Sequence, residues 1–399
     1  VFNDYKEPLF WIHLNMDYPF NLKGILYFPR VNTQYDNLEG VIKLYNNQVF
    51  IADNIKEVIP EFLMLLKGVI DCPDLPLNVS RSALQNDGFV RKISDYITKK
   101  VADKLSGMFK VEREDYEKYW DDISPFIKFG CLKDNKFQEK MKDYIIFKDL
   151  NGAYITLPDY LEQAYPDEFK ETQDSTDEQK EQQDSAQDTS AEDKKPLTVY
   201  YVTDAQQQSQ YINLLKEQGS NALMLTHTID QPFITQLEQN ADEKHPVHFQ
   251  RVDADLSKEM VEEQDVEKLK EQSEALETLF KKNLGQDALV VKVQNLKNDR
   301  VSAMITLSEE ARRMQDMMKM YSMGQDMDMD MFGGQGQTLV LNGNNELVKY
   351  IMDNPESEHV PMFCKQLYDL AMLAHKPLPA QEMTEFVNRS NEIMMLLTK

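Results

Sequence analysis

Residues 67–85 read K-G-V-I-D-C-P-D-L-P-L-N-V-S-R-S-A-L-Q, and they place one arginine, Arg81, between a short apolar run and a helix. The prolines of this run fix φ and favour extended neighbours, which predicts a rigid loop. Asn78 and Ser80 are suited to capping a helix that begins near Arg81. A guanidinium held in this way suits contact with phosphate or carboxylate, because its donors form a planar, permanently charged fork. A structural ion pair is the alternative that these residues leave open.

The chain is long and acidic. Its 399 residues exceed the usual size of a single hydrophobic core, so two or three domains are expected. With 68 Asp and Glu against 44 Lys and Arg, the formal net charge is −24, which disfavours nucleic acid and anionic lipid as partners. No apolar run approaches the roughly 20 residues that span a bilayer, so no membrane association is expected.

The sequence contains no recognisable catalytic or metal-binding pattern. Cys72, Cys131 and Cys364 are widely spaced and odd in number, which indicates a reduced compartment. Their spacing to the six histidines does not match a metal site. Phosphate-cradling loops and nucleophile elbows are also absent. We therefore expect neither a cofactor nor an enzyme activity from this chain alone.

Hydrophobic patterns divide the chain into four parts. Residues 1–165 begin with strand-like alternation and continue with amphipathic helices, as in an α+β or α/β domain. Residues 166–196 form an acidic insertion that is expected to be disordered, because residues 170–195 contain nine acidic and no large apolar side chains; a solvated spacer is its simplest interpretation. Residues 197–284 follow a β-α-β-α-β order with parallel strands expected. Residues 285–399 form a further α+β domain.

A β-hairpin is predicted within the first part. Residues 42–45 and 49–51 are strand-like, and they flank Asn46 and Asn47, which tolerate the positive φ of a tight turn. Phe50 lies in the second strand of this hairpin.

Several runs around Arg81 make the chain resemble one family, the ninety-kilodalton heat-shock chaperones, in their bacterial HtpG form. The similarity is most specific over residues 7–105, and it continues more loosely through residues 129–137 and from Leu307 onward. The runs that carry it are E-P-L-F-W-I-H-L-N-M-D-Y-P-F-N-L-K-G-I-L-Y-F-P (7–29), I-K-L-Y-N-N-Q-V-F-I-A-D (42–53), I-P-E-F-L-M-L-L-K-G (59–68) and N-V-S-R-S-A-L-Q (78–85).

The resemblance implies that this chain corresponds to the middle and C-terminal domains, without the N-terminal ATPase domain. In the family, ATP and Mg²⁺ bind that N-terminal domain, and the middle domain lends an arginine that stabilises charge on the γ-phosphate. The matching residue here is Arg81, with Gln85 one helical turn later as its supporting partner. Phe50 matches a residue that packs against the docked N-terminal domain, and an ordinary core position is the alternative.

A methionine-rich segment is a second candidate site. Eight of the chain's 21 methionines fall within residues 314–331. Helical spacing would gather several of them on one face, and flexible, polarizable methionines suit a surface that accepts many partners. A buried core stripe is the alternative that periodicity leaves open. The resemblance implies contact with client proteins, and the matching residues are Met314, Met317, Met320 and Tyr321.

Phe233 is a further expected client contact. It lies in the run T-I-D-Q-P-F-I-T, where Pro232 stands at the position that is aromatic in the bacterial family. The match is therefore displaced by one residue.

The last two predicted helices, at 361–374 and 380–397, are candidates for a dimer interface. Two short helices cannot bury both apolar faces alone, and pairing with a twin pair would form a four-helix bundle. The family dimerises in this way, and packing against their own domain is the alternative. The expected contact residues are Phe363, Leu367, Leu370, Phe386, Ile393 and Leu396.

The sequence thus predicts the middle and C-terminal part of a cytoplasmic, ATP-dependent chaperone that holds non-native proteins as a homodimeric clamp. The resemblance also admits another chaperone system as a partner. A nucleotide-independent dimeric interaction scaffold is the alternative.

Overall fold

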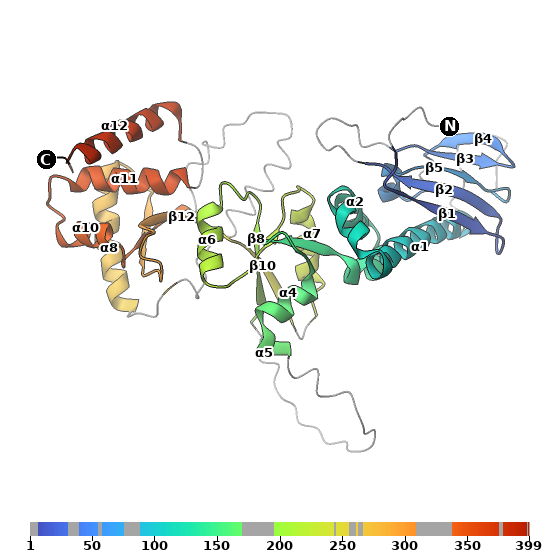
Figure 1. Cartoon of the computed structure of the whole chain (residues 1–399), viewed down its shortest axis with the longest axis horizontal. Helices are drawn as coiled ribbons and strands as arrows, with labels where there is room; N and C mark the ends of the chain where they lie inside the picture. The colour runs from blue at the N-terminus through green and yellow to red at the C-terminus, as the bar shows by residue number, and fades with distance from the viewer. Residues whose placement is uncertain are drawn as a thin grey trace, which may run out of the picture. The chain divides into compact units, whose positions relative to one another are not determined.

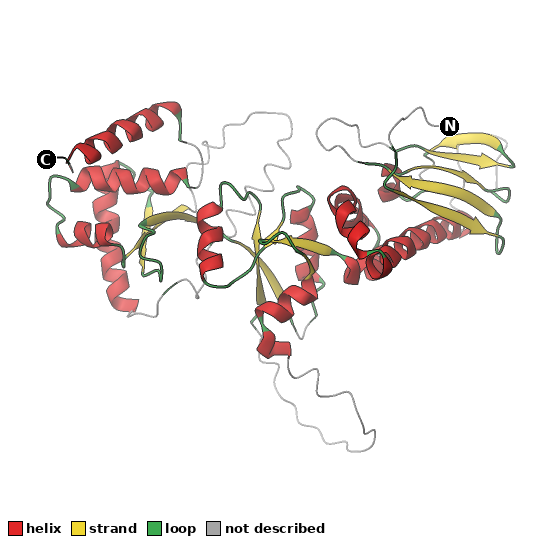
Figure 2. Ribbon diagram, viewed as in Figure 1, coloured by secondary structure: helices red, strands yellow, loops and turns green. Residues whose placement is uncertain are grey.

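The computed structural model of this chain describes residues 7–30, 40–54, 58–75, 88–169, 195–242, 245–254, 261, 266–308, 337–374, 378–396 and 398. Their contacts separate the chain into two compact units. Unit 1 comprises Val1–Phe147, Tyr154–Tyr160 and Ile229–Asn240, and unit 2 comprises Lys148–Ala153, Leu161–Thr228 and Ala241–Lys399. Small sheets and helices alternate along the chain (Figures 1 and 2), so the predicted mixed α/β class is confirmed. Most of the acidic segment at 166–196 lies outside the described residues.

Unit 1 is built on a five-stranded sheet with the order β1-β2-β5-β3-β4. In β1, Phe10, Ile12 and Leu14 are buried while the residues between them are exposed, so one face of this sheet is covered. The strands are β1 (Phe10–Met16), β2 (Leu22–Phe28), β3 (Ile42–Asn46), β4 (Val49–Asp53) and β5 (Lys67–Asp71).

Helices cover the apolar face of this sheet, and α1 runs beside β1 (Figure 1). In α1, Val90, Ile93, Ile97 and Val101 are buried at helical spacing, as their periodicity predicts. The other elements of unit 1 are η1 (Glu61–Leu65), α1 (Gly88–Val111), α2 (Arg113–Lys133), α3 (Asn135–Met141), η2 (Lys142–Tyr144), β7 (Tyr154–Thr156) and α7 (Asp230–Gln239), while β6 (Ile146–Asp149) and α4 (Leu157–Ala164) have residues in both units.

The predicted hairpin forms between β3 and β4, and its last pair joins Asn46 with Val49. The positive φ values fall on Asn47 (50°) and Gln48 (67°), one residue later than predicted. Gln48 N donates a hydrogen bond of 3.0 Å to Asp71 Oδ2, which offsets the cost of the left-handed conformation by anchoring the turn to β5.

Unit 2 contains two sheets. In the first, strands β10, β8, β9 and β6 are neighbours in this order, and β8 is parallel to both β10 and β9, which confirms the predicted parallel pairing. The second sheet has the order β11-β13-β12. The remaining elements are α5 (Pro166–Phe169), β8 (Leu197–Val202), α6 (Ser209–Glu217), β9 (Leu223–Met224), β10 (Val247–Arg251), α8 (Val266–Leu284), β11 (Val290–Gln294), β12 (Ala303–Leu307), β13 (Gln337–Asn342), α10 (Glu346–Asp353), α11 (Val360–Leu373) and α12 (Ala380–Leu396).

The sheet β11-β13-β12 is covered on both faces. Ile305 and Leu339 belong to a core cluster with residues of α8 and α11. Met304 and Val340, which alternate with them along the strands, belong to a second cluster that includes Tyr211 of α6. All residues of β12 are consequently buried.

A buried ion pair attaches α7 to α2 within unit 1. Lys128 Nζ lies 2.5 Å from Asp230 Oδ1, and the two side chains are only 6% and 4% exposed. The ammonium group also lies 5.3 Å from the ring centroid of Phe147 and 5.8 Å from that of Phe233. Charges removed from water in this way require a partner, so this pair fixes where α7 packs.

We predict that Lys128→Met lowers the free energy of unfolding by about 3–5 kcal/mol, because the buried Asp230 carboxylate loses the cation that faces it. Urea denaturation followed by circular dichroism measures this change. The matched control is Lys136→Met, since Lys136 and Asp95 form a 2.9 Å pair whose side chains are 69% and 47% exposed. That control should cost less than about 1 kcal/mol. Equal losses in the two variants would contradict a special role for the buried pair.

Candidate functional site

The residues expected to act on ATP and on client proteins fall mainly outside the described ranges. These residues are Arg81, Gln85, Met314, Met317, Met320 and Tyr321. Their roles stay predictions, and the structure bears on them only through the elements that flank them.

The chain segment that leads to the Arg81 loop is firmly anchored. After β5, Cys72 N donates to Tyr45 O at 3.0 Å, and both Cys72 and Leu75 are buried. Asn46 Nδ2 donates to Pro73 O at 3.1 Å, which ties this segment to the hairpin. Loop entry and hairpin turn therefore lie at the same end of the sheet.

Phe50 is a surface residue of β4. Its side chain is 50% exposed, and its ring lies 5.7 Å from that of Tyr45 in an edge-on arrangement. The neighbouring Val49 is also exposed. These exposures exclude an ordinary core position for Phe50. They also place two exposed apolar side chains on β4, next to the hairpin turn to which the start of the Arg81 loop is hydrogen-bonded. Docking of another domain there stays a prediction.

Phe233 lies in the core of unit 1 rather than at its surface. Its side chain is 1% exposed, and its ring packs beside the Lys128 ammonium group. The reason is its position on α7, where Asp230, Phe233 and Ile234 share the buried side of the helix. A residue so placed has no surface through which to contact a client, so the client surface proposed below excludes Phe233.

The six residues expected at the dimer interface divide into two groups. Leu367 is buried, and Phe363 and Phe386 pack partly against the core of unit 2. Leu370 and Leu396 are exposed, and Ile393 is half-buried. The structure therefore assigns half of the set to the core of its own unit.

Helix α12 keeps an exposed apolar surface. Among its described residues none is fully buried. We use the name α11–α12 stripe for the exposed large apolar side chains on these two helices, which are Leu370, Val387, Met394, Met395 and Leu396.

A polar network fastens α12 to α11. Arg389 Nη2 lies 2.5 Å from Oδ2 of the fully buried Asp369, and Arg389 Nε donates to Gln366 Oε1 at 2.8 Å. Gln366 Nε2 donates in turn to Ser390 Oγ at 3.0 Å. The second oxygen of Asp369 faces Lys365 at 3.3 Å. This network sets the direction of α12 from its middle and so determines where the exposed end of the helix points.

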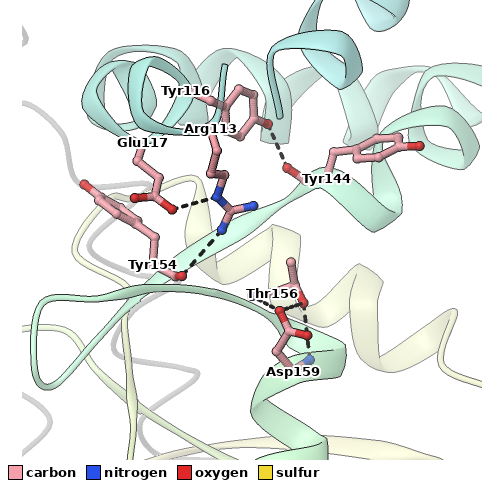
Figure 3. Close-up of polar contacts among 7 residues, drawn as sticks. All are labelled: Arg113, Tyr116, Glu117, Tyr144, Tyr154, Thr156 and Asp159. Carbon is pink, nitrogen blue, oxygen red and sulfur yellow. Dashed lines mark hydrogen bonds and ion pairs between the residues drawn. The ribbon is translucent and has the colours of Figure 1, made fainter. Parts of the chain in front are cut away.

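Figure 3 shows a convergence of charged and aromatic side chains at the start of α2, which could be mistaken for a reactive site. Arg113 Nε donates to Glu117 Oε1 at 2.6 Å, and its Nη2 donates to the carbonyl oxygen of Tyr154 at 3.5 Å. The Tyr116 hydroxyl donates to the carbonyl oxygen of Tyr144 at 2.7 Å, and burial raises the pKa of this phenol. These bonds fix β7 and η2 to α2, so we assign the cluster a structural role.

The same figure shows a helix cap. Thr156 Oγ1 donates to Asp159 Oδ2 at 2.7 Å and accepts from Asp159 N at 3.2 Å, at the residue that precedes α4. The hydroxyl and the carboxylate satisfy the first turn of the helix.

The described cysteines are poor nucleophiles. Burial raises the pKa of Cys72 and of Cys364 to about 11 and that of Cys131 to about 12. Neutral pH therefore leaves them as thiols rather than thiolates. Across the described ranges, no three His, Cys, Asp or Glu side chains are grouped as metal ligands. Nor does any helix there combine the length and the apolar character needed to cross a membrane.

Comparison with known proteins assigns the family. The family model described as Hsp90 protein matches residues 1–399, so this chain belongs to the Hsp90 family. It is 37% identical over 362 residues to the chaperone protein HtpG of Bacteroides fragilis and 36% identical over 365 residues to HtpG of Porphyromonas gingivalis. These matches cover 88% and 89% of this chain but 48% and 49% of those proteins.

A plant relative is more distant. Heat shock protein 90-6, mitochondrial, of Arabidopsis thaliana is 27% identical over 390 residues, which cover 94% of this chain and 45% of that protein. The chain thus spans about half the length of the curated relatives it matches. The resemblance to the bacterial HtpG type that the sequence motifs indicate is confirmed.

Proposed function

We propose that this chain provides the middle and C-terminal parts of an ATP-dependent molecular chaperone that binds non-native proteins as a dimeric clamp. Membership of the Hsp90 family supports a chaperone role. The structural observation on which the proposal rests is the α11–α12 stripe, a set of exposed apolar side chains on a strongly acidic chain.

A second copy of this chain fits the α11–α12 stripe. Exposed apolar surface of this kind is unfavourable in water, and two antiparallel helices complete a four-helix bundle by pairing with their own image. A twofold arrangement needs only one self-complementary patch. The Asp369–Arg389 pair supports this arrangement because it holds α12 without covering its exposed side chains.

In the proposed ATPase cycle, Arg81 reaches the γ-phosphate of ATP that is bound with Mg²⁺ to an N-terminal domain. A cation supplied from another domain stabilises the charge that develops during phosphoryl transfer. The anchored backbone before the loop and the exposed Phe50 on the adjoining hairpin support docking at this end of the sheet. Gln85 would orient the arginine.

Clients would contact Met314, Met317, Met320 and Tyr321. The described strands give this segment a definite origin, because Leu307 of β12 pairs with Gln337 of β13. The two described residues that flank this segment, Leu307 and Gln337, therefore lie side by side in one sheet. Thioether side chains suit varied apolar partners because they are flexible and polarizable.

We predict that the chain is dimeric and that Leu396→Asp weakens the dimer at least about 30-fold, because it places a charge among the exposed apolar side chains of α12 that pairing would bury. Sedimentation velocity over a concentration series measures the dissociation constant. Val290→Asp is the matched control, since Val290 is an exposed apolar residue on β11, and it should leave dimerisation unchanged. A chain that stays monomeric at all concentrations would refute the proposed clamp.

In the intact protein, we expect Arg81→Ala to slow ATP turnover by about 10³-fold while the affinity for ATP stays nearly unchanged, because the arginine acts mainly on the transition state. The turnover rate of Arg81→Lys should lie between those of the unsubstituted protein and Arg81→Ala, since lysine keeps the charge but lacks the planar fork of donors. Arg91→Ala, at an exposed position on α1, is the control. Unaltered turnover in Arg81→Ala would remove this residue from the mechanism.

Client binding is tested by the fluorescence anisotropy of a labelled, permanently unfolded protein titrated with this chain. Joint replacement of Met317, Met320 and Tyr321 by Ser should weaken binding at least about tenfold, because apolar contact area is lost. Val111→Ser is the control. It removes a highly exposed apolar side chain from α1, away from the methionine-rich segment in sequence, and should have little effect on client affinity. Added ATP should change nothing. Absence of client binding in a chain that still dimerises would favour the nucleotide-independent scaffold.

A further inference from the structure

Strand β1 is an edge strand, and the pairing of its neighbours shows which of its backbone groups face outward. Gly68 N donates to Val41 O and Cys72 N donates to Tyr45 O, each at 3.0 Å, so even-numbered residues of β5 bond to β3. Odd-numbered residues of β5 therefore face β2, because backbone groups alternate in direction along a strand.

The same alternation extends to β1. Ile25 of β2 is opposite Val69 of β5, so the odd-numbered residues of β2 bond to β5 and the even-numbered ones bond to β1. Leu26 is opposite Ile12, which assigns the even-numbered residues of β1 to this ladder. The N–H and C=O groups of Trp11, His13 and Asn15 consequently face the open edge.

Asn15 agrees with this assignment. Its N–H donates to the Tyr96 hydroxyl at 3.2 Å, and that hydroxyl donates to the Asn15 carbonyl at 2.8 Å. Helix α1 thus satisfies the edge at Asn15. Among the described residues, none bonds to the outward backbone groups of Trp11 or His13.

A groove runs beside these backbone groups. It has a volume of about 630 Å³ and is bounded by Leu9 to His13 on the strand side and by residues of α1 and α2 on the other. Tyr119 gives the helical wall its accessible apolar surface, while Met108, which also lines the groove, is only 2% exposed. The indole of Trp11 is 53% exposed on the other side of the strand.

The edge also lacks the features that usually prevent strand addition. β1 has seven residues, contains no proline, and pairs with β2 in continuous register without a bulge. Natural edge strands are commonly short, bulged or interrupted by proline, since an open regular edge invites another strand. The groove therefore borders the outward donors and acceptors of Trp11 and His13, on a strand that is regular over its whole length.

The charges along the groove differ between its ends. Lys100 lies one helical turn after Tyr96, which places it towards the Asn15 end. Asp115 lies one turn before Tyr119, whose ring centroid is 6.1 Å from that of Phe10 at the other end.

The middle of the groove contains charges of both signs. Lys104 and Glu112 face each other there at 3.6 Å and offset each other's charge, and Asp103 adds a further negative charge to the wall. A complementary ligand is acidic near Lys100, uncharged in its middle, where Lys104 and Glu112 already pair with each other, and basic near Asp115.

We propose that the edge of β1 binds an extended polypeptide segment as a sixth strand of this sheet. The segment exchanges backbone hydrogen bonds with Trp11 and His13, its alternate side chains enter the groove against Tyr119, and its terminal charges pair with Lys100 and Asp115. About five residues, or roughly 17 Å of extended chain, span these contacts. Dimerisation and ATP are not required for this binding.

The test uses a synthetic seven-residue peptide, blocked at both ends, with Glu near its N-terminus, alternating Val and Thr in the middle and Lys near its C-terminus. Fluorescence anisotropy of the labelled peptide gives its affinity for the full chain. Acrylamide quenching of tryptophan emission reports on Trp11, because the other tryptophan, Trp120, is buried. We expect saturable binding that protects Trp11 from the quencher.

His13→Pro removes the outward N–H without touching the ladder to β2, whereas His13→Ala keeps that N–H and removes the same side chain. His13→Pro should weaken binding at least about tenfold, because a hydrogen bond is lost and the ring obstructs the added strand. His13→Ala should stay within about twofold of the unsubstituted chain. Similar affinities of the two variants would overturn strand addition.

A second peptide has N-methyl groups on the alternate amides that would face β1. It tests the same hydrogen bonds with the unsubstituted chain, so the result does not depend on how His13→Pro folds. It should bind at least about tenfold more weakly than the parent peptide. Undiminished binding of this peptide would overturn the proposal, as would failure of the parent peptide to bind. If the peptide does not bind but His13→Pro abolishes self-association of the chain, the edge of β1 pairs with a second copy of this chain instead.

Discussion

The structure of unit 1 depends on one constraint, the burial of alternating residues of its sheet beneath α1 and α2. Because side chains alternate between the two faces of a strand, a slip of one residue would expose Phe10, Ile12 and Leu14 together. That register determines three surface features at once. It places the hairpin turn beside the entry to the Arg81 loop, leaves Phe50 exposed, and directs the backbone of Trp11 and His13 towards the open edge.

Each unit also uses a buried ion pair to position one helix. Lys128 and Asp230 attach α7 in unit 1, and Arg389 and Asp369 attach α12 in unit 2. Such pairs add little net stability over apolar contacts, but they penalise every arrangement that separates the charges. In unit 2 the pair orients α12 without fully burying any of its described residues. Its apolar side chains remain available to a partner.

Local elements of this chain can be predicted well from the sequence. The β3–β4 hairpin, helices α1, α11 and α12, and the parallel pairing of β8 with its neighbours all follow from periodicity and turn residues. Strand β13 was not predicted, because a short apolar run is compatible with several kinds of element. The grouping of α7 with unit 1 was also missed, since it depends on Lys128, about a hundred residues earlier in the chain.

The sequence by itself determined the family, the candidate arginine and the methionine-rich segment, because these depend on residue identity and spacing along the chain. Only the tertiary structure decided that Phe233 is core, that Phe50 is surface, and that the predicted dimer residues divide between core and solvent. The open edge of β1 and the Asp369–Arg389 pair likewise became visible only in three dimensions. The physical reason is that exposure and ion pairing are properties of contacts between distant segments, which no local pattern records.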